Sequence, residues 1–410
     1  MKNGLLWVAL LGIGLMNCGT DDEGTSDTKP KAPDAGGVDG HPGDDASAHG
    51  GSGGAAGAGG ASAGAAGHST AGSGGTGSSG AGGSAGGAAG TGGSSGQGAA
   101  AGANGDYLAS QYPGDKGIEN DPAVVWVENF EEGSVDALVA RYNDAKKNGL
   151  TLDAQSHPNS IGKASGKFTA NGSGPQAVDL YKNFGAGYDE LFVRYYVKYG
   201  SGAQWHHTGV WLGGYAPPSN WPSPQAGLKP EGNDRFHISF ETMGSSPNPR
   251  LDFYNYWMKM HSWKDNPTGS DAYYGNTIVH QKDRIAHDNQ WMCVEIHLKL
   301  NTNPASSQGA ELGLWIDDQS VIQFNDSSPQ GCWIKDKFCP QTGPVADDPS
   351  CTDYPNLCKK PYVPLDLQFR STTDLRINAF WPQNYITEGG AGTVWYDDMV
   401  LARSRIGCIP

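Results

Sequence analysis

Strict alternation of apolar and polar residues is the feature of this sequence that most restricts its fold. In residues 235–241, Phe236, Ile238 and Phe240 alternate with polar side chains, so the apolar set would lie on one face of a strand. Similar runs, separated by Gly, Pro and Asn, occur at residues 191–199, 251–258, 291–300, 311–316, 365–370 and 375–381. The pattern is typical of antiparallel sheets with one buried and one wetted face. We therefore predict an all-β fold, a β-jelly-roll sandwich of two antiparallel sheets, with one short helix within residues 135–147.

The N-terminal quarter of the chain has a composition that cannot form a core. Residues 20–104 consist largely of Gly, Ala, Ser and Thr, so they would bury too little apolar surface to offset the loss of conformational entropy. We predict a disordered linker over residues 18–104, whose Gly-rich coil would span about 50 Å. Residues 105–410 hold eleven of the twelve tryptophans and are predicted to form a single domain.

The first residues, 1–17, are typical of a secretory signal peptide. Lys2 precedes an apolar run at residues 5–16, which is too short to span a bilayer. The sequence Leu-Met-Asn-Cys at residues 15–18 resembles a bacterial lipobox. This resemblance implies lipidation of Cys18 and an exported lipoprotein of the outer membrane or cell surface, which contacts the membrane only through its lipid anchor. An ordinary signal peptide followed by a chance cysteine is the alternative.

Six further cysteines lie in the predicted domain, where export permits disulfides. Four of them crowd into one Pro- and Asp-rich insertion and predict two bridges among Cys332, Cys339, Cys351 and Cys358. A zinc site is the alternative, but the spacing lacks the close Cys-x-x-Cys pair that structural zinc sites use. By elimination, Cys293 and Cys408 would then pair with each other.

Three short motifs resemble a known family. They are Asn-Phe-Glu-Glu-Gly at residues 129–133, Trp-Met-Cys-Val-Glu-Ile-His at 291–297, and the end of the chain, Val-Trp-Tyr-Asp-Asp-Met at 394–399 with Gly-Cys-Ile-Pro at 407–410. These motifs resemble the first, a middle and the last strand of secreted concanavalin-A-like jelly rolls of the glucuronan-lyase and alginate-lyase type. The loops between the strands do not match, and this domain is longer. The resemblance implies a surface-tethered lyase that cleaves a uronate-containing polysaccharide by β-elimination.

The resemblance also implies a structural calcium ion. In such folds a glutamate of the first strand and an aspartate of the last strand bind Ca²⁺, and the matching positions here are Glu131 and Asp398. Carboxylate oxygens from neighbouring chain ends suit this hard cation. The alternative is that Asp397 and Asp398 only cap the end of a strand.

A uronate lyase must neutralise the sugar carboxylate, remove the C5 proton and protonate the leaving O4. Arg235 is the candidate for neutralisation, and His237 or His207 with Tyr254 or Tyr256 would exchange protons. The predicted substrate-binding residues are Ser239, Glu241, Arg194, Asn378 and Trp211. His206 and His207 are adjacent, so on one strand they would point to opposite faces and could not serve the same site.

Two positions depart from the family pattern. In alginate-lyase relatives a Ser-x-Arg strand and a lysine after a Gly-Gly turn belong to the site, whereas this chain has Glu241 and the sequence Thr-Gly-Val at residues 208–210. Arg235 or Arg194 would then have to replace the missing cation. Three explanations stay open: chemistry rebuilt on histidines, a different substrate, or loss of catalysis.

Charge separates the possible functions further. The chain carries a formal net charge of −15, and the predicted domain alone still carries about −10. This balance disfavours nucleic acid, and a polyanionic glycan would need a locally basic surface. We expect a monomer with a polysaccharide partner. The alternatives are a non-catalytic carbohydrate-binding lipoprotein and a glycoside hydrolase, in which Glu241 and Asp252 would lie about 5–5.5 or 6.5–9.5 Å apart.

Overall fold

The computed structural model describes eight stretches of the chain, residues 107–171, 176–223, 225–243, 246–262, 272–278, 285–340, 362–386 and 390–410. All of them lie within one compact unit, Gly51–Pro410. The predicted signal peptide and linker, together with Cys18, Cys351 and Cys358, lie outside the described residues. Among the helices that are described, none has the length and apolar character needed to cross a membrane.

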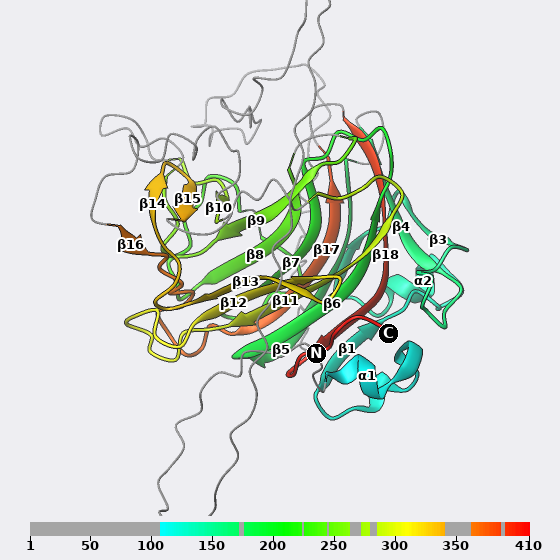
Figure 1. Ribbon diagram of the computed structural model, residues 1–410, viewed down its shortest axis with the longest axis horizontal. Helices are drawn as coiled ribbons and strands as arrows, with labels where there is room; N and C mark the ends of the chain where they lie inside the picture. Colours follow the sequence, from blue (N-terminus) through cyan, green and yellow to red (C-terminus); the bar gives the residue numbers. More distant parts are fainter. Residues whose placement is uncertain are drawn as a thin grey trace, which may run out of the picture. The chain divides into compact units, whose positions relative to one another are not determined.

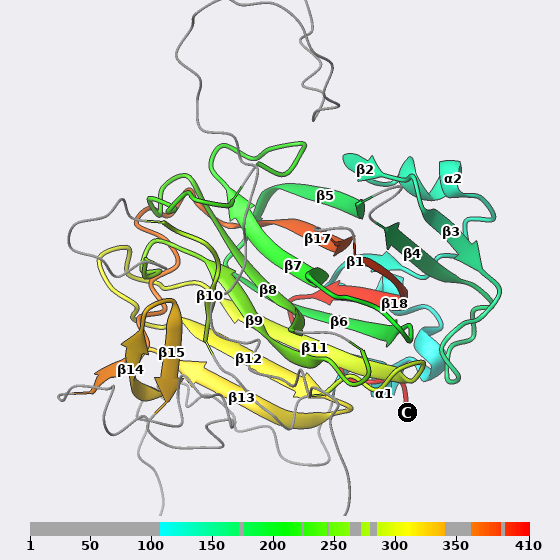
Figure 2. The same cartoon turned by 90° about the horizontal axis from the view of Figure 1, so that it is seen from above.

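Strands of the described residues form two sheets, which stack face to face (Figures 1 and 2). The eight-stranded sheet has the order β13 (Gln319–Asn325), β12 (Glu311–Ile316), β11 (Trp291–Lys299), β6 (Glu190–Tyr199), β18 (Ala391–Ala402), β4 (Ser165–Asn171) and β3 (Leu150–Asp153), and β1 (Val124–Glu128) also pairs with β18. The first and last described strands therefore lie side by side, so the two ends of the domain share one sheet.

The second sheet carries the candidate site. Its order is β16 (Val363–Pro364), β14 (Gln330–Ile334), β15 (Lys337–Pro340), β10 (Asn276–Thr277), β9 (Arg250–Tyr256), β8 (Arg235–Met243), β7 (His207–Tyr215), β17 (Ile377–Tyr385), β5 (Ala177–Tyr188) and β2 (Asp144–Lys146). Among the described strands all pairs are antiparallel except β10 with β15. The predicted β-jelly-roll sandwich is confirmed.

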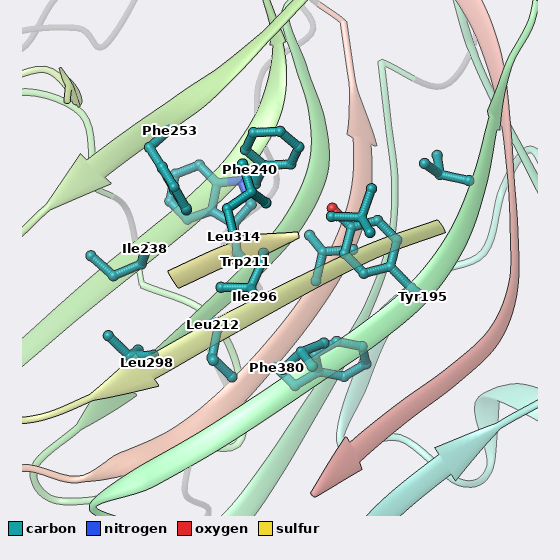
Figure 3. Close-up of a cluster of buried hydrophobic side chains, with 14 of the residues drawn as sticks. Tyr195, Trp211, Leu212, Ile238, Phe240, Phe253, Ile296, Leu298, Leu314 and Phe380 are labelled. Atoms are coloured by element: carbon teal, nitrogen blue, oxygen red, sulfur yellow. The ribbon is translucent and has the colours of Figure 1, made fainter. Parts of the chain in front are cut away.

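The core lies between the two sheets and is built by the apolar halves of the alternating strands. Ile238 and Phe240 of β8 face Ile296 and Leu298 of β11 across the sandwich (Figure 3). Each of these four side chains is at most 1% exposed. Because successive side chains of a strand point to opposite faces, the polar half of β8 must lie on the far side of its sheet from the core.

Two predicted elements differ from the structure. Residues 365–370 are buried and extended but form no strand, because the side chain of Asn301 takes the place of a partner strand. Its Oδ1 accepts hydrogen bonds from the backbone N–H groups of Phe369 (3.0 Å) and Arg370 (3.1 Å). The predicted helix is shorter than residues 135–147. It spans only α2 (Val135–Val139), with Ser134 as its N-cap, and the chain then enters β2.

The C-terminus is held against the eight-stranded sheet. The predicted disulfide between Cys293 and Cys408 is confirmed, and Glu295 accepts the backbone N–H groups of Ile406 (2.6 Å) and Gly407 (3.0 Å). The remaining short helices, α1 (Leu108–Gln111), η1 (Pro113–Asp115) and η2 (Ile118–Asn120), precede β1. In the cysteine-rich insertion, Cys332 and Cys339 are both disulfide-bonded.

Candidate functional site

The polar face of the ten-stranded sheet gathers most of the predicted site residues. On β8 these are Arg235, His237, Ser239 and Glu241. The register places Ser239 between Trp211 of β7 and Tyr254 of β9, and it places His237 beside Tyr256. Residues that are directly opposite on neighbouring strands have Cβ atoms about 4.5–5.5 Å apart. The antiparallel pairing therefore brings side chains from three strands into one patch.

Glu241 is the centre of a hydrogen-bonded network on this face. Its carboxylate accepts from Ser239 Oγ (2.6 Å) and Trp211 Nε1 (3.0 Å) at Oε2, and its Oε1 lies 2.9 Å from Nδ1 of His207. Glu241 is 1% exposed, and a buried carboxylate is stable only when such partners satisfy it. Glu241 thus orients its neighbours. The polar atoms of Ser239 and Trp211 serve the same network, so these three predicted substrate-binding residues position other groups.

His207 is the histidine whose ring this network holds in place. Pairing of Nδ1 with Glu241 favours the tautomer with the proton on Nδ1, which leaves Nε2 as a hydrogen-bond acceptor and base. The imidazole lies close to aromatic rings on both sides, with centroids 5.0 Å from Tyr254 and 5.9 Å from Tyr385. Of the two histidines proposed for proton transfer, His207 has the partner that a general base needs.

The expectation that His206 and His207 point apart is wrong. Their ring centroids lie 3.9 Å apart. The reason is that β7 begins at His207, so His206 lies outside the strand and the alternation rule does not apply to it.

His237 lies deeper and apart from this network. It is fully buried, and neither ring nitrogen has a hydrogen-bond partner. Its neighbours are aromatic, with ring centroids 5.0 Å away for Tyr215 and 5.8 Å for Trp211. Burial, with a smaller contribution from Arg235, lowers the pKa of His237 to about 3. The ring is therefore neutral at pH 7.

This buried histidine makes stability depend on pH. In the unfolded chain a histidine has a pKa near 6.5. Below that pH the unfolded state binds a proton at this histidine, whereas the folded state does not, so the unfolded state is favoured. The stabilising contribution is complete above about pH 6.5 and is lost as the pH falls toward 3. At pH 5 we expect a loss of about 2 kcal/mol. Urea unfolding of the wild type and of His237→Phe at pH 7.5 and 5.0 measures this loss of folding free energy. The variant should lose less stability than the wild type on acidification. Equal losses in the two proteins would contradict the burial argument.

Arg235 lies on the same face of the sheet as His207, but the two side chains are too far apart to contact the same sugar ring. Its guanidinium is held by Asp234 and by Gln225, whose Oε1 lies 3.2 Å from Nε. Arg235 and Glu241 are six residues apart on β8, which corresponds to about 20 Å. The proposed pairing of Arg235 with His207 on one uronate is therefore wrong, because strand length separates residues that the alternation puts on one face.

Arg194 belongs to the other sheet, so its predicted role in substrate binding is also wrong. It lies on β6, is fully buried, and forms an ion pair with Asp115 of the N-terminal segment. Its guanidinium also lies 5.3 Å from the ring centroid of Tyr196. Strands β6 and β8 are both amphipathic, and nothing in the local sequence distinguishes the sheet to which each belongs.

Asn378 lies in the ten-stranded sheet, but its side-chain amide forms hydrogen bonds with backbone groups. Its Oδ1 accepts from the N–H of Tyr215 (3.0 Å), and its Nδ2 donates to the carbonyl of Tyr215 (2.9 Å). The register of β17 against β5 shifts between Ile377 and Ala379. The side chain therefore satisfies backbone groups at an irregular position, which corrects the predicted role in substrate binding.

Gln383 and Tyr385 are site residues that the sequence analysis missed. On β17, Gln383 pairs with Gly209, and Tyr385 pairs with His207. Gly209 lies between His207 and Trp211 along β7, and between Gln383 and Glu241 across the sheet. A Cβ at Gly209 would lie 2.7 Å from Cβ of Glu241, so the centre of this group must lack a side chain. The predicted strand ends at residue 381, because Pro382 and the adjacent polar residues Gln383 and Asn384 interrupt the alternation, although β17 continues to Tyr385.

The carboxylates of the predicted calcium site lie at the other sheet. Asp397 and Asp398 are buried, and this burial raises the pKa of Asp397 to about 8 and that of Asp398 to about 6. Glu131 adds to both increases, and Oδ2 of Asp398 is buried without a hydrogen-bond partner. Oε1 of Glu131 already accepts two backbone N–H groups, from Lys163 and Ala164. Within the described ranges, no group of three or more His, Cys, Asp or Glu has metal-binding geometry.

Comparison with known proteins adds a fold likeness. No protein-family model matches the chain, and no curated protein matches it. Among solved structures it is similar to alginate lyase Aly36B (12% identity, covering 70% of this chain and 99% of that one, TM-score 0.39). It is also similar to the PL-14 alginate lyase from Aplysia kurodai (10%, 68% and 98%, 0.42) and to endo-β-1,4-glucuronan lyase from the fungus Trichoderma reesei (11%, 68% and 95%, 0.36).

Proposed function

We propose that the domain is a polysaccharide lyase that cleaves a uronate-containing glycan by β-elimination. The observation that carries the proposal is the network in which Glu241 orients His207 beside the ring of Tyr254 on a face rich in aromatic rings. A histidine held by a carboxylate is a common general base, and tyrosine is a suitable acid partner.

The proposed elimination divides into three tasks. Nε2 of His207 removes the C5 proton, the electron pair of the C5–H bond becomes the C4–C5 double bond, and the C4–O4 bond breaks. Tyr254 donates its phenolic proton to the departing O4. Burial and the neighbouring Tyr256 raise the pKa of Tyr254 well above its ordinary value, so it is protonated at neutral pH and suits the role of acid. The amide of Gln383, on the far side of Gly209, would hydrogen-bond the sugar carboxylate.

One assay series separates this proposal from its alternatives. The protein is incubated with alginate, glucuronan and a neutral glucan, while the ultraviolet absorbance of the unsaturated product and the reducing ends are followed together. Rising absorbance on a uronate supports the lyase. New reducing ends without absorbance would indicate the hydrolase, for which Glu241 and Asp252 are directly opposite on β8 and β9. Binding without either signal would indicate a carbohydrate-binding module.

We further propose that Glu131 and Asp398 bind a structural Ca²⁺. The support is the buried, mutually repelling pair of Asp397 and Asp398, and the Oδ2 of Asp398 that lacks a partner, since a cation would remove both costs. At a Ca²⁺ concentration of 100 times Kd, the ion should add about 2.7 kcal/mol to folding stability. Thermal melting with Ca²⁺ and with a chelator measures this. Asp398→Asn should abolish the difference, whereas Asp136→Asn, at an exposed position, should retain it; a wild type indifferent to Ca²⁺ would contradict the site.

We also propose that a lipid attached to Cys18 anchors the protein to the membrane. Replacement of Cys18 with alanine should release the full chain from the membrane fraction, because no lipid would then be attached. Metabolic labelling with a radioactive fatty acid, followed by fractionation, tests this. Equal labelling of the wild type and the variant would show that Cys18 is not the lipidated residue.

A further inference from the structure

Four side chains form a row of alternating lysine and tryptophan on the eight-stranded sheet. Lys167 of β4 pairs with Trp395 of β18, Trp395 pairs with Lys198 of β6, and Lys198 pairs with Trp291 of β11. The residues next to them along these strands belong to the hydrophobic core, so the row lies on the outer face. The candidate lyase site is on the outer face of the other sheet, so the two lie on opposite sides of the sandwich.

Contacts within the row hold the aromatic rings and the cations together. Nζ of Lys198 lies 4.4 Å from the ring centroid of Trp395 and 5.0 Å from that of Trp291. Lys167 approaches Trp395 to 5.4 Å. Asp153 accepts a hydrogen bond from Nε1 of Trp395 (2.8 Å), which fixes the orientation of the indole. The row is therefore organised before any ligand arrives, and such preorganisation lowers the entropy cost of binding.

A pocket of about 400 Å³ adjoins this row. Trp395 forms one wall, and its lining includes Thr169, Thr393 and Asn289. A Cβ at Gly200 would lie 3.3 Å from Cζ3 of Trp395 and 2.8 Å from the carbonyl oxygen of Thr393, so glycine keeps this end of the indole uncovered. The volume is typical of small-ligand sites, and the mixture of one aromatic wall with hydroxyl and amide groups suits a sugar ring.

We propose that Lys167, Trp395, Lys198 and Trp291, with the adjoining pocket, form a second polysaccharide-binding site for a glycan that carries carboxylates. Indole rings pack against the C–H faces of pyranoses, and the ammonium group of Lys167 pairs with a carboxylate. Lys198 is 6% exposed and its Nζ donates to Oε1 of Gln155 (3.1 Å), so Lys167 is the cation of the row that a bound glycan reaches. Asp153, 3.9 Å from Lys167, offsets only part of the charge of the two lysines. This local positive charge on a chain of net charge −15 favours a polyanion as the occupant.

The choice of a uronate glycan rests on the proposed function, but the binding test does not require catalysis. Affinity electrophoresis in gels that contain alginate or glucuronan is run with His207→Ala as the background. Lys167→Gln should weaken retention about threefold, and Trp395→Ala about tenfold. The matched control is Lys299→Gln. Lys299 faces the same side of β11, about 26 Å from Trp291, and should leave retention unchanged.

Kinetics then distinguish the second site from the catalytic one. In the otherwise wild-type protein, Lys167→Gln should raise KM for the polymer but not for a tetrasaccharide, which cannot reach both faces at once. If lyase activity is absent, gel retention still decides the binding site. Unchanged retention in Lys167→Gln and in a Trp395→Ala variant with a normal melting curve would overturn the proposal. Equal retention in a neutral glucan gel, or equal weakening by Lys299→Gln, would overturn it as well.

Discussion

Replacement of His207 with alanine is expected to lower kcat on the uronate substrate by about 10²–10⁴-fold, the usual contribution of a general base. The reason is geometric: His207 alone among the candidates has a carboxylate at Nδ1 and a tyrosine beside its ring. Glu241→Gln should lower kcat with little change in KM, because Glu241 acts through the histidine and does not bind the sugar. The measurement is the initial rate of unsaturated product over a range of substrate concentrations.

His237→Phe is the matched control for this experiment. His237 lies on the same face of the same sheet, but it is four residues from Glu241 on β8, about 13 Å, and is enclosed by aromatic rings. The variant should keep kcat within about twofold of the wild type. If His237→Phe abolished product formation while His207→Ala retained it, the roles assigned to the two histidines would have to be exchanged.

Replacement of Arg194 with methionine is expected to destabilise the fold by about 3–5 kcal/mol, the usual cost of removing one partner from a buried ion pair. Methionine keeps much of the side-chain stem but leaves Asp115, whose side chain is 9% exposed, without its cation. Arg194 also lowers the pKa of buried Asp398 in β18, so its loss would remove a favourable interaction with that carboxylate. Urea unfolding at fixed Ca²⁺ concentration measures the change.

Arg376→Met provides the comparison for this variant. Arg376 pairs with Asp189 at 2.6 Å, but both side chains are well exposed, and exposed pairs contribute about 0–1 kcal/mol. The two variants therefore make the same chemical change in different surroundings. A cost for Arg194→Met no larger than that for Arg376→Met would contradict the buried role. Weaker glycan binding with unchanged stability would instead restore the role first expected from the sequence.

Strand periodicity predicted the fold well where the strand pairs with a neighbour on each side. The prediction for residues 311–316 matches β12, and that for residues 235–241 lies within β8. It failed at residues 365–370, where every residue except Asp366 is buried and Asn301 satisfies the backbone. Periodicity reports which face is buried, and it does not report which group accepts the hydrogen bonds.

Site prediction succeeded along single strands and failed between them. Alternation on β8 placed His237 and Glu241 on one face, as the structure has them. It could not show that Glu241 would pair with His207, since 34 residues separate them in the sequence. The same limit caused Gln383 to be missed, because only the pairing of β17 with β7 brings it to the site.

The sequence by itself determined the all-β class of this protein, the polar and apolar faces of its longer strands and the pairing of Cys293 with Cys408. These properties follow from side-chain alternation and from the number of cysteines, both of which are local or countable. Only the tertiary structure decided that Arg194 belongs to the opposite sheet from Glu241, and that Arg235 is too distant to assist His207. Strand order and register are set by the packing of the whole sandwich, so the neighbours of a functional group cannot be inferred from one strand alone.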